Sequence, residues 1–401
     1  MKIALVDGIP EKSSKSWKGR DRGLFHYPFP LLKLGTFAKS EGHEVHPYIH
    51  KLPSKEDRFD EVWLTTIFTF HIPYHKALIE RLKVNSSKIV VGGISATLLP
   101  YQYEQMGVEV FRGLHPIAEL CDPDYSLLPS PPEYSIVFTS RGCVRKCEFC
   151  MVRRLEPKFI NYSDWTRQLA PNVEAKQIKL SDNNFIAKPF KALEKDVDIL
   201  KSLVAEKRVN NIDINQAMDA RLMTKKVANL LSGLPIDPIR FAFDNMETDG
   251  HYQKAINLMV ESGFKNEFLA YMLYNYKDTP QDFYYRLKES VLLTAKYGGK
   301  IQVGAFPMEY RPILDVDFDR SYVGENWTTL TKKNIRVMMD AIGTGTVSTR
   351  YPEDFEYYFG KDEAEFTKML HYPALSKLTD RKKAKRREMK YKRRKKKLEN
   401  K

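Results

Sequence analysis

The sequence predicts an α/β protein: an N-terminal Rossmann-like parallel sheet, then a partial (β/α)6 barrel, a small C-terminal helical cap and a basic tail. Two series of short apolar runs alternate with amphipathic stretches, and a proline-dense segment separates the two series. Such alternation is typical of parallel sheets covered by helices. The chain has 401 residues, more than one ordinary compact core requires, so we expect more than one domain.

The first series occupies residues 1–113 and predicts the Rossmann-like domain. Apolar runs that predict buried strands lie at 2–6, 44–49, 61–70, 88–93 and 108–113. Two stretches between them, 28–42 and 73–84, have apolar residues at helical spacing, and the first ends on Gly42, a residue that favours a helix end. The next segment, 114–133, holds five prolines, which exclude a regular helix and predict a linker.

The second series occupies residues 134–318 and predicts the barrel. Strands are expected at 134–140, 177–182, 211–219, 239–244, 268–275 and 301–308, with helices at 189–207 and 224–234 among the connections. In such barrels the reactive groups lie at the carboxyl ends of the strands. Residues 319–378, with mixed aromatic and acidic segments, predict the helical cap, and 379–401 the basic tail.

Three of the chain's four cysteines lie in "SRGCVRKCEFC", directly after the first predicted barrel strand. Thiolates are soft ligands that suit zinc or an iron–sulfur cluster. A structural zinc site needs four ligands, whereas the remaining Cys121 lies in the linker and no histidine is near. A four-iron cluster held by three thiolates leaves one iron open to a further ligand. We therefore expect Cys143, Cys147 and Cys150 to hold a metal cluster.

Polar residues follow the next two strands. Asp182, Asn183 and Asn184 end the second strand, where they can accept hydrogen bonds from a ligand or simply form a capped turn. Gln216 and Arg221 follow the third. The arginine can pair with a ligand carboxylate, and an internal pair with Asp219 is the alternative.

The cysteine spacing, together with "KLSDNNF", "FAFDN" and "FPMEYRP", resembles the radical S-adenosylmethionine (SAM) superfamily, in the subgroup with an N-terminal cobalamin-binding-like domain. The resemblance implies a [4Fe-4S] cluster whose open iron binds SAM. One electron, from an external donor of the flavodoxin or ferredoxin type, then cleaves SAM to methionine and a 5'-deoxyadenosyl radical. Phe149 holds the family's aromatic position, and we expect it to seat SAM together with Asp182, Asn183, Asn184, Gln216 and Arg221. The glutamate that often ends the second strand is absent, and Asp182 or an adjacent asparagine is its expected substitute.

The same resemblance raises the question of cobalamin. Members that ligate cobalt carry an Asp-x-His-x-x-Gly stretch, which this chain lacks; "FTFHIPYH" contains only His71 and His75. We expect the N-terminal domain to serve substrate binding or packing without cobalamin. A cobalamin bound without a protein ligand stays open as the alternative.

The net charge of +14 is concentrated in the tail. Residues 381–401 hold 14 Lys or Arg and two Glu, which leaves 51 basic and 49 acidic residues in 1–380. A solvated tail and an electrostatic arm that binds nucleic acid are both open. With no apolar run near the ~18 residues of a membrane span, no leader pattern and too few cysteines for a disulfide framework, we expect a cytoplasmic protein without a membrane segment.

These observations predict a radical SAM enzyme that modifies an unidentified substrate, with nucleic acid as one candidate. One alternative is cobalamin-assisted radical methyl transfer. The other is a non-catalytic nucleic-acid-binding protein that holds zinc or a cluster.

Overall fold

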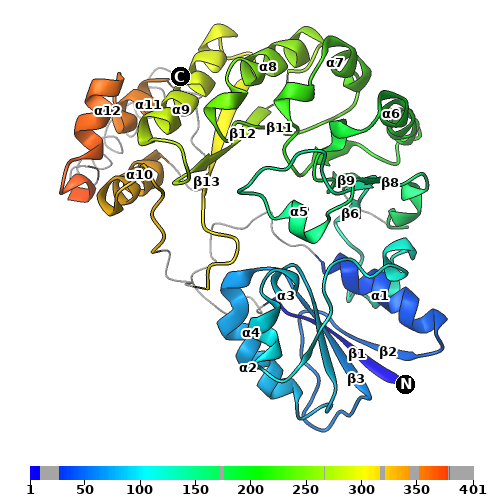
Figure 1. Ribbon diagram of the computed structural model, residues 1–401. Helices are drawn as coiled ribbons and strands as arrows, with labels where there is room; N and C mark the ends of the chain where they lie inside the picture. The colour runs from blue at the N-terminus through cyan, green and yellow to red at the C-terminus, as the bar shows by residue number, and fades with distance from the viewer. Residues whose placement is uncertain are drawn as a thin grey trace, which may run out of the picture. The chain divides into compact units, whose positions relative to one another are not determined.

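The computed structural model describes residues 1–9, 27–171, 176–265, 267–316, 321–342, 352–377 and Thr379. The chain divides into two compact units, and Figure 1 follows its elements from the N-terminus to the C-terminus. Unit 1 comprises Met1–Gln216, Gly233–Ile236 and Pro312–Arg320. Unit 2 comprises Ala217–Ser232, Asp237–Arg311 and Ser321–Lys401.

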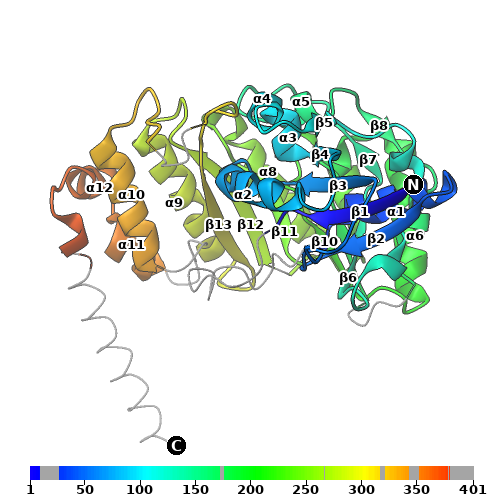
Figure 2. The ribbon, with the colours of Figure 1, turned by 90° about the horizontal axis from the view of Figure 1, so that it is seen from below.

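Unit 1 begins with a five-stranded parallel sheet in the order β2-β1-β3-β4-β5, whose neighbouring strands are visible in Figure 2. Its strands are β1 (Lys2–Asp7), β2 (Glu44–Tyr48), β3 (Glu61–Thr66), β4 (Ile89–Gly93) and β5 (Glu109–Val110). Its helices are α1 (Phe29–Ser40), α2 (Ile72–Leu82), α3 (Ile94–Leu98) and α4 (Pro100–Glu104). This order confirms the predicted Rossmann-like sheet and places a topological switch point between the carboxyl ends of β1 and β3.

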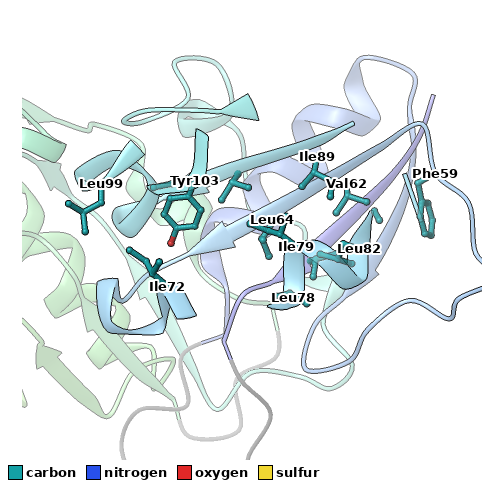
Figure 3. Close-up of a cluster of buried hydrophobic side chains, with 14 of the residues drawn as sticks. Phe59, Val62, Leu64, Ile72, Leu78, Ile79, Leu82, Ile89, Leu99 and Tyr103 are labelled. Carbon is teal, nitrogen blue, oxygen red and sulfur yellow. The ribbon is translucent and has the colours of Figure 1, made fainter. Parts of the chain in front are cut away.

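Both faces of this sheet are buried, which explains why its strands are continuous apolar runs. Alternate residues of β1 enter different clusters: Ala4 and Val6 pack with α2 and Tyr103, and Ile3 and Leu5 pack with α1. Figure 3 shows the first cluster, in which side chains from β3, α2, β4 and α4 meet.

The second cluster extends beyond the N-terminal sheet. Leu127 from the proline-rich segment and Tyr134 and Ile136 from the first barrel strand belong to it. The Tyr27 hydroxyl donates to the Tyr134 carbonyl at 3.2 Å. Because α1 is covered by these residues, the first barrel strands join the N-terminal sheet in one unit. The division between compact units therefore falls inside the predicted barrel, whereas the sequence placed its domain boundaries at 114–133 and 318.

The six predicted barrel strands are present as two three-stranded parallel sheets. Unit 1 contains β10-β9-β6, formed by β6 (Tyr134–Val137), β9 (Gln177–Leu180) and β10 (Asn211–Ile214). Unit 2 contains β11-β12-β13, formed by β11 (Ile239–Ala242), β12 (Glu267–Tyr274) and β13 (Gln302–Glu309). The connecting helices are α5 (Val152–Leu155), α6 (Phe190–Ala205), α7 (Lys225–Leu231), α8 (His251–Glu261) and α9 (Pro280–Lys296). A short antiparallel pair, β7 (Ser140–Arg141) and β8 (Ile160–Asn161), was not predicted.

The predicted cap consists of helices of unit 2: α10 (Thr329–Ile342), α11 (Pro352–Phe359) and α12 (Glu363–Leu370). Aromatic stacking joins it to α9, since Tyr284 lies 4.5 Å from Phe366 and 5.7 Å from Phe355 between ring centroids. The predicted tail, 381–401, lies outside the described residues. Within the described part of the chain, no helix combines the length and apolarity that crossing a membrane would require.

Candidate functional site

The three clustered cysteines lie on the loop between β7 and α5, after the carboxyl end of β6. All three are reduced thiols and half-buried. The Cys150 N–H donates to the Cys147 carbonyl at 3.1 Å, which folds the last turn of the motif. The Arg145 N–H donates to the Cys143 sulfur at 3.4 Å. Hydrogen bonds to sulfur are one means by which a protein tunes the reduction potential of an iron–sulfur cluster.

The cysteine loop, residues 142–158, closes on itself. Gly142 has a φ of +75°, and a Cβ at this position would overlap the Lys158 carbonyl. Its N–H donates to the Glu156 carboxylate at 2.7 Å. β7 and β8 pair across the base of the loop. Glycine is thus required at the entrance, because no other residue fits both the conformation and the space.

Arg141 ties the base of the loop to the proline-rich segment. Its Nε and Nη2 donate to the two carboxylate oxygens of Glu119 at 2.8 and 3.1 Å, and its Nη1 donates to Glu156 at 3.1 Å. The guanidinium also stacks 3.4 Å from the Phe138 ring centroid. Burial favours the neutral acid, but Arg141 and Lys33 outweigh it and lower the pKa of Glu119. A buried carboxylate–arginine–carboxylate arrangement therefore fixes the start of the cysteine loop.

Asp182 is fully buried just past β9 and holds the end of β6. Its carboxylate accepts from the Thr139 N–H at 2.7 Å, the Thr139 hydroxyl at 2.5 Å and the Ser140 hydroxyl at 2.7 Å. Lys188, also fully buried, lies 3.3 Å from Asp182 and donates to Asp196 at 2.6 Å. Oδ1 accepts one of these bonds and Oδ2 accepts the other two, so the contacts of Asp182 in the structure position the end of β6.

The other residues expected to seat SAM differ in placement. Asn183 donates to Glu156 at 2.6 Å and so joins the base of the cysteine loop. Asn184 is buried, Phe149 is half-buried within the loop, and Gln216 is exposed at the last position of the first segment of unit 1. Four of the five predicted SAM contacts in unit 1, together with the three cysteines, thus belong to the loop or to the turn after β9. Gln216 follows β10.

Arg221 belongs to unit 2, where it forms the internal pair that the sequence left open. Its Nε and Nη2 donate to Asp219 at 2.8 and 3.1 Å. Unit 2 also contains a buried arginine that sequence reasoning missed: Arg286 donates to the carbonyls of Phe243, Asp244 and Leu273. Arg286 thereby fixes the carboxyl ends of β11 and β12, and its role depends on burial, which the sequence does not display.

The donor set of the loop fits an iron–sulfur cluster. Three reduced thiols on one fixed loop are soft ligands, and each would bind a separate iron of a four-iron cluster. No three His, Cys, Asp or Glu side chains within the described ranges gather closely enough to hold a single metal ion. Cys121, the fourth cysteine, donates its thiol to the Ile117 carbonyl at 3.6 Å.

The cysteine loop lies against the carboxyl edge of the N-terminal sheet. Leu155, the last residue of α5, packs on the cluster drawn in Figure 3, and α5 contacts α3, which follows β4 directly. At this edge, Asp7 ends β1 at the switch point. Its Oδ2 is buried 3.6 Å from Nδ1 of His50 and has no hydrogen-bond partner among the residues that the structure describes. Burial raises the pKa of Asp7 to about 6.

Both histidines of "FTFHIPYH" are buried. His75 is fully buried, with Nδ1 2.8 Å from the Tyr103 hydroxyl and Nε2 3.0 Å from the Gly8 carbonyl oxygen. Burial lowers the pKa of His75 to about 4. His71 is buried, and burial also lowers its pKa. A Cβ at Gly93, φ +98°, would overlap the Thr66 carbonyl, so this glycine allows close backbone packing at the end of β4.

Known structures share this fold. The radical S-adenosylmethionine methyltransferase TsrM from Kitasatospora setae, with cobalamin and a [4Fe-4S] cluster bound, has a TM-score of 0.51 at 12% identity, over 76% of this chain and 75% of that chain. The same enzyme with tryptophan substrate and the SAM analogue aza-SAM has a TM-score of 0.54 at 13% identity, over 73% and 71%. No protein-family model and no curated protein matches the chain.

At this identity the likeness shows a shared fold, and it confirms the predicted architecture and the resemblance at that level. The TsrM structure of this fold holds cobalamin as well as the cluster, so the likeness does not bear out the expectation that cobalamin is unlikely.

Proposed function

We propose that the protein is a radical SAM enzyme that cleaves SAM reductively and uses the resulting radical to modify a substrate. The observation that carries the proposal is the closed loop bearing Cys143, Cys147 and Cys150 at the carboxyl end of β6. When bound, the [4Fe-4S] cluster supplies one electron to SAM, which yields methionine and a 5'-deoxyadenosyl radical. The fold shared with TsrM supports the proposal.

The chain's own residues would hold and orient these groups. The three thiolates would bind the cluster, and Phe149 and the 183–184 turn would seat SAM beside it. Arg141, Glu119 and Glu156 would fix the loop. Asp182 would hold the end of β6 from which the loop starts.

Anaerobic reconstitution with iron and sulfide tests the cofactor half of this proposal. We expect about four irons and four sulfides per chain in the wild type and loss of the cluster in C147A. C121A is the matched control, because its thiol is bonded to a backbone carbonyl away from the motif. Stoichiometric zinc without iron, or equal iron in C147A and the wild type, would support the zinc-containing binding protein instead.

A second proposal is cobalamin-assisted methyl transfer. It is favoured by the contact of the cysteine loop with the carboxyl edge of the N-terminal sheet, the edge at which folds with this strand order bind their ligands. Because both ring nitrogens of His75 are engaged, a bound cobalamin would lack this histidine as a ligand. Titration with hydroxocobalamin tests it: bound corrinoid whose absorbance is the same in the wild type and H75Q supports this mode, and absence of binding removes it.

The basic tail supports nucleic acid as a candidate substrate class. Its net charge of +12 exceeds that of the rest of the chain, +2, and would contact phosphates without specifying sequence. Removal of residues 381–401 should weaken oligonucleotide binding and flatten its dependence on salt. Equal binding with and without the tail would contradict this assignment.

A further inference from the structure

The exposed side chains of the cysteine loop are mainly cationic or apolar, although the protein before its tail is nearly neutral. Its exposed cations are Lys146, Arg153, Arg154 and Lys158. Three large apolar side chains on the loop or just after it are also exposed: Val144 by 48%, Met151 by 41% and Ile160 by 44%. The residues before the tail carry a net charge of only +2 over 380 positions, so four exposed cations within 13 positions are a local concentration.

The loop is not held together by ion pairs of these four cations, as far as the described residues show. In the described part of the chain, none of the four forms an ion pair, whereas the buried Arg141 at the base of the same loop pairs with two carboxylates. The acid of the loop that could offset them, Glu156, is engaged by Arg141, Gly142 and Asn183. Glu148 is the one exposed carboxylate in residues 142–158, so the exposed side of the loop keeps a positive charge.

The loop's position makes this surface relevant to electron delivery. All three candidate cluster ligands belong to residues 142–158, and Gly142 and Lys158 meet at the base of the loop. The exposed side chains of the loop are therefore the solvent-facing groups covalently nearest to the cluster. An electron from an external protein must reach the cluster from a surface close to it. Exposed apolar side chains close in sequence to exposed charged ones are a composition that suits a transient protein contact.

We propose that this face, formed by Val144, Lys146, Met151, Arg153, Arg154 and Lys158, is the docking surface for an acidic one-electron carrier protein. The inference rests on the proposed function, because it requires a redox cluster in the loop. One electron passes from the reduced carrier to the cluster: the carrier is oxidised by one unit and the cluster reduced by one, with no bond or proton transferred. Opposite charge would steer the encounter and orient the carrier.

A protein partner fits this face better than nucleic acid does. Single-stranded nucleic acid binding combines cations with aromatic side chains on which bases stack. The exposed apolar residues here are aliphatic, and the aromatic residue of the loop, Phe149, is half-buried. The contact would be small and short-lived, as is typical of electron-transfer pairs.

The test compares two reductants on the reconstituted full chain. Stopped-flow absorbance would follow bleaching of the cluster by an acidic ferredoxin, reduced beforehand, and by dithionite. We expect the charge reversal R153E/R154E to lower the rate constant with ferredoxin about tenfold at low ionic strength and to leave the dithionite rate unchanged. Added salt should slow the wild type and have little effect on the variant.

The matched control is K191E/K195E, which makes the same charge change at two exposed lysines of α6. It should keep the wild-type ferredoxin rate. If R153E/R154E fails to take up the cluster, the milder R153Q/R154Q should still show a smaller decrease. An equal rate in the wild type and R153E/R154E, or an equal decrease in K191E/K195E, would overturn the proposal.

Two further outcomes are decisive. If R153E/R154E loses binding of a single-stranded RNA oligonucleotide while ferredoxin reduction is unchanged, the face contacts nucleic acid and the carrier proposal is wrong. If the wild type takes up the cluster and dithionite bleaches it but no SAM is cleaved, the proposed function fails by itself. The ferredoxin comparison still decides the docking surface, because bleaching does not depend on turnover.

Discussion

The guanidinium of Arg141 meets the carboxylate of Glu119 through two parallel hydrogen bonds, 2.8 and 3.1 Å long, and both side chains are largely buried. Glu119 belongs to the proline-rich segment and Arg141 directly precedes the cysteine loop. The pair therefore connects the segment that follows the N-terminal sheet to the start of the candidate cluster site.

Replacement of Arg141 by methionine should destabilise unit 1 by about 3–5 kcal/mol and lower the iron content after reconstitution, because two buried carboxylates lose their cation. Thermal or urea unfolding and iron analysis measure both effects. The control is R167M, which removes an arginine from an exposed pair with Asp122 and should cost at most about 1 kcal/mol. Equal stability and equal iron in the two variants would show that the Arg141 pair does not fix the loop.

A methyl group at Gly142 should disrupt the base of the loop. G142A places a side chain at a positive φ and against the Lys158 carbonyl. The left-handed conformation alone lowers the free energy of unfolding by about 1–2 kcal/mol. Because of the added overlap, G142A should lower it further and should reduce cluster uptake. G107A isolates the conformational cost, because Gly107 has a φ of +73° and open space around it. The account predicts normal iron in G107A; a G142A protein that matched it in stability and iron would refute the steric argument.

The D182N variant separates the positioning role from a direct contact with SAM. Loss of a buried acceptor of three hydrogen bonds and of the charge next to Lys188 should lower stability by about 2–4 kcal/mol. The D182N protein that still folds and binds the cluster should bind SAM with an affinity close to that of the wild type. A titration with SAM measures this affinity. D198N, at an exposed position of α6, should change neither quantity. A large loss of SAM affinity at unchanged stability would instead favour direct contact.

The stability of unit 1 should respond to the ionisation of Asp7. Because burial raises its pKa from 3.8 to about 6, the folded state binds the proton more tightly than the unfolded state. The stability gained from protonation is present in full below pH 4 and is lost as the pH rises through 6. D7N, which mimics the neutral acid, should therefore be more stable than the wild type by up to about 3 kcal/mol at pH 7–8. A difference in melting temperature between D7N and the wild type that does not change from pH 4 to pH 8 would contradict this assignment.

The sequence was sufficient to predict the strands of the parallel sheets in both units. A strand that is buried on both faces is a continuous apolar run. The pair β7–β8 was not predictable, since its members, "SR" and "IN", do not form separate apolar runs. The join of β6 to the N-terminal core was missed for a different reason. It depends on α1 being covered by Leu127, Tyr134 and Ile136, which are about a hundred residues away in the chain.

The candidate site divides in the same way. The cysteine spacing is local, so the sequence was sufficient to locate the loop. The arrangement of Glu119, Arg141 and Glu156 was missed because its members come from separate segments. Asp182 was found by its place after a strand, but its burial against Thr139 and Ser140, which sets its role, depends on the packed fold.

The measurement that tests the central claim most directly is the anaerobic incubation of the reconstituted protein with SAM and dithionite, followed by chromatography of the products. The account predicts 5'-deoxyadenosine and methionine in the wild type and neither product in C143A, C147A or C150A, with C121A as active as the wild type. A protein that holds the cluster and leaves SAM intact, or that cleaves SAM equally well without Cys147, would contradict it.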